Sequence, residues 1–366
     1  MKGLILSVTA GQGHNQTAKV LCDCFVEKGV KCSYLDTFEY INPIISKTIA
    51  NGYLMSTKVM PKAYGMFYRL AEKPTSADMH MTPKITNMLL SNKLLKMIAD
   101  EDPDFLICTH VYAAILITCV KEYMNKDIQT IGIITDFTVH PYWEDTKLDI
   151  YVTASELLTN QGVKKGISKE KFLPLGIPID RRYETKIDKC EARKKLNIED
   201  KRTILVMSGS MGFGKIIDEI TNLDNLDLDF QIITVCGNNK KLKEQIDALD
   251  TKKKIYNFGY VNNVDVMMDA SDCIVTKPGG LTTSEALAKG LPMIISNPIP
   301  GQEDRNVEFL LNSGAAIKVS ETYSIDDAVL QMFGGERMTK ICETVKLMGK
   351  PYATRDLVEF VINNKK

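Results

Sequence analysis

Residues 273–292 read Cys-Ile-Val-Thr-Lys-Pro-Gly-Gly-Leu-Thr-Thr-Ser-Glu-Ala-Leu-Ala-Lys-Gly-Leu-Pro. The stretch opens on four residues typical of a buried strand and turns at a pair of glycines. It then continues with helix-forming residues until Gly290 and Pro292 end the helix. A second apolar run, Met293–Ser296, follows directly. This order of strand, glycine turn, helix and strand predicts a βαβ unit of a parallel sheet.

The same alternation of apolar runs and helical patterns extends along the whole chain. Most of the runs are continuously apolar, as in parallel strands that are covered on both faces. In the first half we expect strands at Leu4–Val8, Cys32–Leu35, Phe105–Thr109, Thr130–Thr135 and Ile150–Thr153. In the second half we expect strands at Thr203–Ser208, Gln231–Cys236, Ile255–Phe258, Cys273–Thr276, Met293–Ser296 and Ala316–Val319.

The alternation is interrupted between Leu175 and Glu184, where a glycine and a proline punctuate the sequence. We therefore predict an α/β protein with two Rossmann-like parallel-sheet domains, an N-terminal one at residues 1–180 and a C-terminal one at residues 181–349. A last helix, at about residues 350–366, is a candidate to pack back on the first domain.

Length and composition agree with two domains and exclude several classes of protein. The chain has 366 residues, and single cores stop growing at about 250–300 residues. It carries 46 basic and 46 acidic side chains, and this zero net charge argues against a nucleic-acid binder that works by phosphate neutralisation. Nine cysteines without a C-x-x-C pair are typical of free thiols in a cytoplasmic protein. The longest apolar stretch, Ile107–Val120, falls short of the roughly 20 residues that span a bilayer.

The first predicted strand runs into Gly11-Gln12-Gly13-His14, and a helix follows. A glycine turn that opens a helix lets backbone N–H groups approach an anion. A nicotinamide-binding fingerprint would need a third glycine where Gln16 stands, although Asp36 is placed like its ribose-binding acid. His14 is the informative residue, because a helix N-terminus favours the neutral imidazole that can act as a base. The alternative is a polar helix-start residue without chemistry.

A second glycine turn, at residues 208–215, superficially fits the spacing of a P-loop. Ile216 stands where an ATPase needs a Ser or Thr hydroxyl for Mg²⁺. A glycine nest at a helix start can still hold a diphosphate without a dedicated metal. In the third turn, Thr282 and Glu285 have the spacing of a capping box, so Glu285 either closes the helix N-terminus or accepts ribose hydroxyls.

At this third turn the sequence resembles a known family. The motif Lys-Pro-Gly-Gly-x-Thr-x-x-Glu-Ala, followed by Pro300-Gly301-Gln302-Glu303 and Asn306, is similar to that of bacterial diacylglycerol glucosyltransferases and plant monogalactosyldiacylglycerol synthases. It is more distantly similar to the transferase that makes peptidoglycan lipid II. The resemblance also includes Gly-x-Gly-His at 11–14, Thr135-Asp136-Phe137 with His140 and Trp143, Leu175-Gly176-Ile177-Pro178, and Gly209-Ser210-Met211-Gly212. It implies a GT-B fold, with two Rossmann-like domains facing each other across a cleft.

The resemblance further implies that the C-terminal domain binds a UDP-sugar. The glycine turns would face the diphosphate, the backbone near Phe258 would hold the uracil, Glu285 the ribose, and Gln302 and Glu303 the sugar hydroxyls. The expected donor-binding residues are therefore Gly209, Ser210, Met211, Gly212, Phe258, Tyr260, Val261, Gly279, Gly280, Leu281, Thr282, Glu285, Gln302 and Glu303. For Glu303 the alternative is a carboxylate that only stabilises a helix start.

The implied chemistry is a single displacement that inverts the anomeric carbon and moves glucose or galactose to diacylglycerol. His14 is the expected general base, and Asp136 could orient or replace it. Gly13, His140 and Trp143 are expected on the acceptor side, with a purely structural role for His140 and Trp143 as the alternative. Glycine and helix N–H groups would stabilise the leaving UDP, so neither a metal nor another cofactor is expected.

A basic segment in the first domain predicts how the chain meets a lipid acceptor. Residues 47–96 contain eight Lys or Arg against two acidic side chains, interleaved with Tyr, Phe and Met. This composition suits an interfacial segment on an anionic membrane, at the inner face of the cell membrane. The alternative is a helical insertion that is exposed to solvent and whose methionines fill the core.

Three other functions fit the same motifs. The protein could use another lipid-linked acceptor, be a UDP-sugar epimerase, or be a non-catalytic nucleotide-sugar sensor. A sensor would retain Glu285 and Gln302 but would not need His14, so His14 favours catalysis. The residues do not distinguish glucose from galactose, because the two sugars differ at one hydroxyl.

Overall fold

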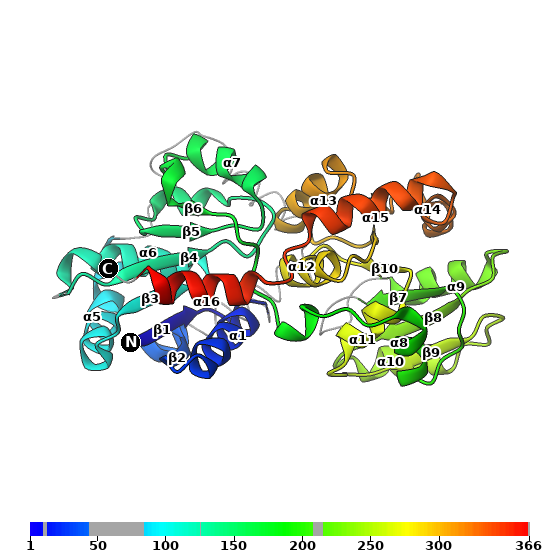
Figure 1. Cartoon of the computed structure of the whole chain (residues 1–366), viewed down its shortest axis with the longest axis horizontal. Helices are drawn as coiled ribbons and strands as arrows, with labels where there is room; N and C mark the ends of the chain where they lie inside the picture. The colour runs from blue at the N-terminus through cyan, green and yellow to red at the C-terminus, as the bar shows by residue number, and fades with distance from the viewer. Residues whose placement is uncertain (10–12, 44–83, 125, 208–214, 365–366) are drawn as a thin grey trace. The chain divides into compact units, whose positions relative to one another are not determined.

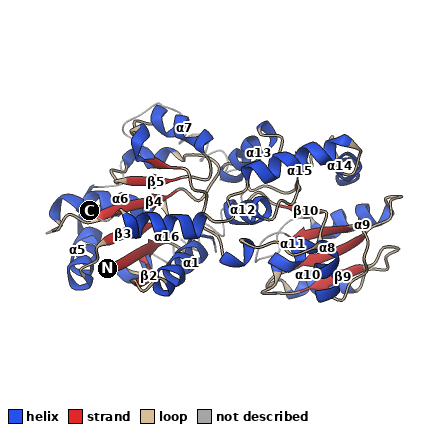
Figure 2. Ribbon diagram, in the orientation of Figure 1, coloured by secondary structure: helices blue, strands red, loops and turns tan. Residues whose placement is uncertain are grey.

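Two parallel sheets carry the fold, one in each of the two units into which the chain divides (Figures 1 and 2). The computed structural model describes residues 1–9, 13–43, 84–124, 126–207 and 215–364, without the side chains of residues 84–91 and 302. The first unit comprises Met1–Asp180, Pro300–Gln302 and Tyr352–Lys366, and the second comprises Arg181–Ile299 and Glu303–Pro351.

In the first unit, the described strands form one sheet in the order β2-β1-β3-β4-β5-β6, with all neighbours parallel. The strands are β1 (Lys2–Ser7), β2 (Lys31–Asp36), β3 (Phe105–Cys108), β4 (Gln129–Ile133), β5 (Ile150–Val152) and β6 (Phe172–Leu173). The helices are α1 (Gly13–Glu27), α2 (Thr37–Ile41), α5 (Lys84–Glu101), α6 (Val111–Val120), α7 (Thr159–Lys164) and α16 (Ala353–Asn363). Short 3-10 helices are η1 (Lys121–Tyr123), η2 (Pro141–Asp145), η3 (Glu156–Leu158) and η4 (Lys169–Lys171).

Both ends of the chain contribute to the core of the first unit. Phe25 of α1 belongs to the same apolar cluster as Leu357 and Val361 of α16. In Figure 1 the red helix α16 lies beside the blue helix α1, and the two are in contact. Thr354, at the start of α16, donates a hydrogen bond to the carbonyl of Ile179 (2.5 Å). The last helix of the chain therefore completes the unit in which the chain begins.

In the second unit, the sheet order is β12-β11-β10-β7-β8-β9, again with parallel neighbours. The strands are β7 (Thr203–Met207), β8 (Gln231–Val235), β9 (Ile255–Phe258), β10 (Cys273–Thr276), β11 (Met293–Ile295) and β12 (Ala316–Lys318). The helices are α8 (Lys189–Lys195), α9 (Ile216–Asn225), α10 (Lys240–Asp247), α11 (Val264–Ala270), α12 (Gly280–Ala288), α13 (Gln302–Asn312), α14 (Ile325–Met332) and α15 (Glu336–Met348), preceded by the 3-10 helix η5 (Arg181–Tyr183).

These sheets confirm the predicted parallel α/β architecture. Each of the eleven expected strands is present with ends within two residues of the expected ones. Sequence analysis missed β6, because a strand of two residues has no periodicity to detect. The capping-box alternative for Glu285 is wrong, because Gly279 is the N-cap of α12 and the helix has no side-chain cap.

The basic segment predicted at residues 47–96 lies mostly outside the described residues. Its described end belongs to α5, where Leu94 and Met97 are buried and Lys93 Nζ donates to the carbonyl of Ile41 in α2 (2.9 Å). Membrane contact by this segment stays a prediction. None of the helices in the described parts of the chain is long and apolar enough to cross a bilayer.

A buried ion pair fixes the start of the second unit. Lys289, at the end of α12, donates to Asp269 of α11 (2.7 Å) and to the carbonyl of Thr185 (2.5 Å). The Lys289 and Asp269 side chains are almost fully buried. Asp269 also accepts from the backbone N–H of Ile187 (3.3 Å), so the pair holds the segment that follows η5.

We predict that Lys289→Met lowers the free energy of unfolding by about 3–5 kcal/mol, because it leaves the Asp269 carboxylate buried without its counter-ion. Chemical denaturation measures the change. Lys195→Met is the matched control: Lys195 is exposed in α8, and we expect it to change stability by no more than about 0.5 kcal/mol. Equal stability of the two variants would contradict the prediction.

Candidate active site

His14 lies near the start of α1, where the ends of three neighbouring strands meet. Its Nδ1 is 2.7 Å from the carbonyl oxygen of Thr109 and 3.1 Å from Thr135 Oγ1. Thr109 directly follows β3, Thr135 comes just after β4, and both strands lie on the same side of β1 in the sheet. Ligands of open α/β sheets bind at this carboxyl edge of the strands, so the predicted base is placed where a substrate is expected.

The hydrogen bond to Thr109 determines which ring nitrogen of His14 carries the proton. A carbonyl oxygen only accepts, so Nδ1 is the protonated nitrogen and the lone pair of the neutral ring is on Nε2. Burial lowers the pKa of His14, while the Thr109 carbonyl and the charge of Asp136 act in the opposite direction. The side chain is thus a neutral imidazole near pH 7, with Nε2 able to take a proton.

A second histidine, His110, packs against His14. The two rings meet edge to face, with centroids 4.5 Å apart. His110 caps α6, and its Nδ1 accepts from the backbone N–H of Tyr112 (3.1 Å). Burial, with His14 and His140 nearby, holds the pKa of His110 well below its usual value. His110 is therefore a neutral imidazole that packs against the neutral ring of His14.

His110 was not among the candidate residues that the sequence singled out. The available signal was its position, directly between an apolar strand and a helix, which is the pattern that singled out His14. Only the strand order brings the two positions together.

Aromatic rings continue from this pair of histidines toward His140. Tyr112 lies 5.0 Å from His110 and 6.1 Å from Tyr142, and Tyr142 lies 4.7 Å from His140, each measured between ring centroids. His140 caps η2 through its Nδ1, which accepts from the N–H of Tyr142 (3.1 Å). The structure thus brings His140 into the ring cluster that includes the candidate base.

Trp143 is not part of this cluster. It is buried and packs edge to face on Tyr151, with ring centroids 6.0 Å apart. A side chain at Gly132 in β4 would come within 2.8 Å of the Trp143 ring. This packing favours the structural alternative for Trp143, and an acceptor-side role stays a prediction.

Asp36, which resembled the ribose-binding acid of a nicotinamide enzyme, has two local partners. Its Oδ2 accepts from both the N–H and the hydroxyl of Thr9 (2.6 Å each). Its Oδ1 accepts from the N–H of Glu39 and caps α2 (2.9 Å). The carboxylate therefore fixes the chain after β1, close to His14, and its contacts do not favour ribose binding.

In the second unit, the start of α12 combines helix N–H groups with a lysine. The first turn of a helix leaves N–H groups without helical acceptors, here those of Gly280, Leu281 and Thr282. Lys277 Nζ would lie 3.6 Å from a Cβ placed on Gly279, so the ammonium borders this helix start. Glu303 Oε1 would lie 3.7 Å from the same Cβ, so the Lys277–Glu303 ion pair as a whole borders the glycine at the N-cap. Such an arrangement suits a diphosphate.

Both carboxylate oxygens of Glu303 already have partners within the protein. It is 5% exposed and forms an ion pair with Lys277. Its other oxygen accepts from the backbone N–H of Ile299 (2.7 Å). Asn306 of the same helix, α13, donates to the carbonyl of Pro278 (2.8 Å). Glu303 therefore orients Lys277 and closes the loop before α13, which adds a third role to the two considered from sequence.

The remaining residues expected to bind the donor differ in burial, and some of them lie outside the described residues. Glu285 is half-buried in the second turn of α12. The carbonyl of Phe258 accepts from the N–H of Cys236 (2.8 Å), whereas Tyr260 is 65% exposed and Val261 half-buried. Outside the described residues lie the 209–212 loop (Gly209, Ser210, Met211 and Gly212) and the side chain of Gln302. Their contacts with a donor stay predictions.

Two family descriptions match the chain in succession. Residues 14–179 match "Monogalactosyldiacylglycerol (MGDG) synthase", and residues 188–343 match "Glycosyl transferases group 1". Over 373 aligned residues the chain is 31% identical to the processive diacylglycerol beta-glucosyltransferase of Bacillus pumilus, covering 99% of this chain and 94% of the relative. The chain belongs to the diacylglycerol glycosyltransferase family.

Other comparisons agree with this membership. The relative with the same description in Bacillus subtilis is 31% identical over 339 residues, covering 91% of this chain and 87% of that protein. Among solved structures, MurG of Acinetobacter baumannii has a TM-score of 0.67 and 14% identity, with 99% of both chains covered. This structural likeness confirms the GT-B fold that the sequence predicted.

In this diacylglycerol glycosyltransferase, a buried carboxylate that sequence analysis missed anchors the turn after β11. Glu219 of α9 accepts from the hydroxyl of Ser296 and from Asn297 Nδ2 (2.7 Å). Asn297 has a left-handed backbone, with φ of 49°, at the turn that leads from β11 toward α13. Burial raises the pKa of Glu219, and its two hydrogen bonds oppose this shift. No sequence pattern singles out Glu219, since it is one acid among several in its helix.

We predict that Glu219→Ala lowers the free energy of unfolding by about 1–3 kcal/mol, because it leaves the buried Ser296 hydroxyl without its acceptor. We also expect a higher KM for the donor, since the turn before α13 loses its anchor. Thermal unfolding and donor saturation curves measure the two effects. Asp218→Ala is the matched control, an exposed acid one position earlier in α9; if it behaves like Glu219→Ala, the interpretation is wrong.

Proposed function

We propose that this protein transfers a hexose from a UDP-sugar to diacylglycerol, with inversion at the anomeric carbon, and so forms a membrane glycolipid. The observation that carries the proposal is 31% identity to a processive diacylglycerol beta-glucosyltransferase over nearly the whole chain. The neutral, oriented imidazole of His14 supports it, because an alcohol acceptor benefits from a general base. We propose glucose as the hexose, because the relatives that match along the whole length are described as glucosyltransferases.

The proposed reaction begins with His14 in its neutral form. Nε2 takes the proton from the acceptor hydroxyl while the acceptor oxygen forms a bond to the anomeric carbon. The bond from that carbon to the UDP oxygen breaks at the same time, and the electron pair leaves with UDP. Asp136 favours the imidazolium that results, because its negative charge raises the pKa of His14. One displacement of this kind inverts the anomeric carbon.

The leaving UDP gains negative charge, which the second unit is equipped to stabilise. The N-terminal N–H groups of α12 and the ammonium of Lys277 border the same position. Glu303 holds that ammonium in place through its ion pair. Catalysis without a dedicated metal or cofactor stays a prediction. The lipid acceptor places the proposed reaction at a membrane surface, and we propose the inner face of the cell membrane.

We predict that His14→Ala lowers kcat by about 10²–10⁴-fold, the usual contribution of a general base, while the dissociation constant for UDP stays unchanged. In the unaltered enzyme, kcat/KM is expected to fall only below pH 6.5, the ordinary pKa of histidine, because burial lowers the pKa of His14 and protonation removes the base. The acidic limb should disappear in the variant.

Asp136→Asn separates the two candidate bases. If His14 is the base, Asp136→Asn retains turnover and moves the acidic limb to lower pH, since the charge that raises the pKa of His14 is lost. If His14→Ala turns over normally and Asp136→Asn does not, Asp136 is the base and the assignment to His14 is wrong.

The whole proposal is tested by incubating the protein separately with UDP-glucose and UDP-galactose over diacylglycerol vesicles, with thin-layer separation of the lipids. We expect a glycolipid from UDP-glucose and a much slower reaction with UDP-galactose. A faster reaction with UDP-galactose would overturn the choice of sugar. Binding of UDP-sugar without glycolipid from either donor would overturn the acceptor, and favour another lipid-linked acceptor or a sensor.

A further inference from the structure

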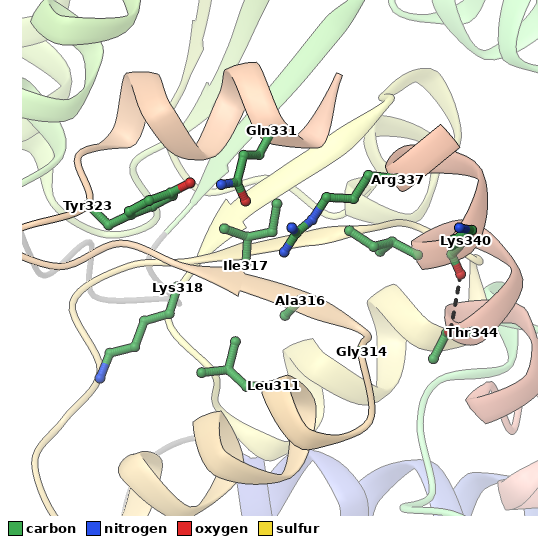
Figure 3. Close-up of a pocket in the computed structure, with 11 residues that line it drawn as sticks. Leu311, Gly314, Ala316, Ile317, Lys318, Tyr323, Gln331, Arg337, Lys340 and Thr344 are labelled. Atoms are coloured by element: carbon green, nitrogen blue, oxygen red, sulfur yellow. Dashed lines mark hydrogen bonds between the residues drawn. The ribbon is translucent and has the colours of Figure 1, made fainter. Parts of the chain in front are cut away.

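A cavity of about 620 Å³ at the edge of the second sheet does not form a ligand site. It is lined by residues of β12, α13, α14 and α15 (Figure 3). Lys318 extends away from Arg337 and Gln331 in this view, and the side chains of Arg337 and Lys340 are exposed. The polar side chains of the cavity therefore do not converge on one ligand. The surroundings of the candidate base are more informative.

Hydrogen bonds hold the His14 ring at one end only. Within the described part of the chain, both of its hydrogen bonds are at Nδ1, to the Thr109 carbonyl (2.7 Å) and to Thr135 Oγ1 (3.1 Å). These bonds do not by themselves fix the direction of the Nε2 lone pair. A general base depends on that direction, because proton transfer requires hydrogen-bond geometry with the acceptor hydroxyl. What packs against the His14 ring therefore affects the proposed reaction.

The ring of His110 packs against the ring of His14. The two centroids are 4.5 Å apart and the ring planes are inclined by 74°, so the edge of one ring meets the face of the other. His110 follows Thr109 directly, between β3 and α6. The N–H of Thr109 donates to the carbonyl of Leu6 in β1 (3.0 Å), so sheet pairing places this junction beside His14. The backbone thus holds the His110 ring where it limits rotation of the His14 ring.

Helix capping alone does not explain a histidine at position 110. Its Nδ1 accepts from the N–H of Tyr112 at the start of α6 (3.1 Å). Asn, Asp, Ser and Thr are the preferred N-cap residues, and each of them satisfies such an N–H with a smaller side chain. His140 caps η2 in the same manner, through the N–H of Tyr142 (3.1 Å), and its ring lies against Tyr142. His140 is therefore a second histidine cap with which His110 can be compared.

The His110 ring also keeps water from His14. Burial is the largest cause that lowers the pKa of His14, and a ring in contact with it supplies part of that burial. The other charged or titratable groups around the pair are Asp136, which raises the pKa of His14, and His140, which lowers the pKa of His110. A smaller polar side chain at position 110 would let water reach His14, and the pKa of His14 would then rise toward its ordinary value of 6.5.

We propose that His110 is a positioning residue for the base: its ring, and not its cap on α6, sets the direction of His14 Nε2 and shields the imidazole from water. The proposal rests on the proposed function, since His110 acts on the acceptor hydroxyl only through His14.

Two substitutions separate the ring of His110 from its cap. His110→Asn keeps an N-cap acceptor for α6 and removes the ring, whereas His110→Phe keeps a ring and removes the acceptor. We expect His110→Asn to lower kcat by about 10–100-fold, with an unchanged dissociation constant for UDP. His110→Phe should retain a higher kcat than His110→Asn but have a lower melting temperature. A residue that only caps α6 predicts the opposite order of kcat.

A second readout does not depend on sugar transfer. The chain has four histidines, so ¹⁵N-histidine labelling with long-range ¹H–¹⁵N correlation spectra follows the tautomer and the titration of each ring. In the unaltered protein we expect His14 to carry its proton at Nδ1 and to titrate below pH 6.5. In His110→Asn the His14 midpoint should move toward 6.5, and the acidic limb of kcat/KM should move with it. His140→Asn is the matched control, which replaces the other histidine cap and should leave the His14 midpoint in place.

Three results would overturn the proposal. One is that His110→Asn leaves either kcat or the His14 midpoint unchanged. Another is that His110→Phe lowers kcat as much as His110→Asn does, and the third is that His140→Asn moves the His14 midpoint equally far. If the unaltered protein forms no glycolipid, the proposed function is contradicted instead, and the His14 midpoints alone decide whether His110 shields His14.

Discussion

The hydrogen bond from His14 Nδ1 to the carbonyl of Thr109 depends on the parallel pairing of β1 with β3. These strands are separated by 97 residues of sequence (8–104), yet their carboxyl ends meet at one edge of the sheet. The bond satisfies a buried ring nitrogen and fixes the tautomer, which leaves Nε2 as the basic atom. His110 reaches the same place as the residue that follows Thr109. The strand order therefore creates the imidazole pair, and with it the neutral base that the proposed reaction requires.

The second unit uses carboxylates mainly to shape its backbone. Glu219 and Glu303 lie on different helices, and each binds the chain between β11 and α13, at Asn297 and Ile299 respectively. Glu303 also holds Lys277 beside the start of α12. A diphosphate gains from such fixed donors, because no reorganisation is needed when charge develops. Glu303, which the sequence assigned to the sugar hydroxyls, thus supports Lys277, a group expected to bind phosphate.

Sequence patterns predicted the strands well because continuous apolar runs and glycine turns are local signals. β6 was missed because two residues carry no pattern. His14 was found through its place after a strand and at a helix start. Trp143 was assigned to the acceptor side, whereas its ring fills the space next to Gly132. The contact between Trp143 and Gly132 depends on how the strands pack, which the sequence does not show.

The sequence by itself determined the α/β class, the strand positions, the glycine turns and the family, because these depend on periodicity, turn chemistry and motif order along the chain. Tertiary structure alone decided that His110 lies against His14 and that Glu219 and Glu303 hold one loop. The physical reason is that each of these depends on side chains from separate elements meeting across a sheet edge, and neither their distances nor their burial is encoded in local sequence.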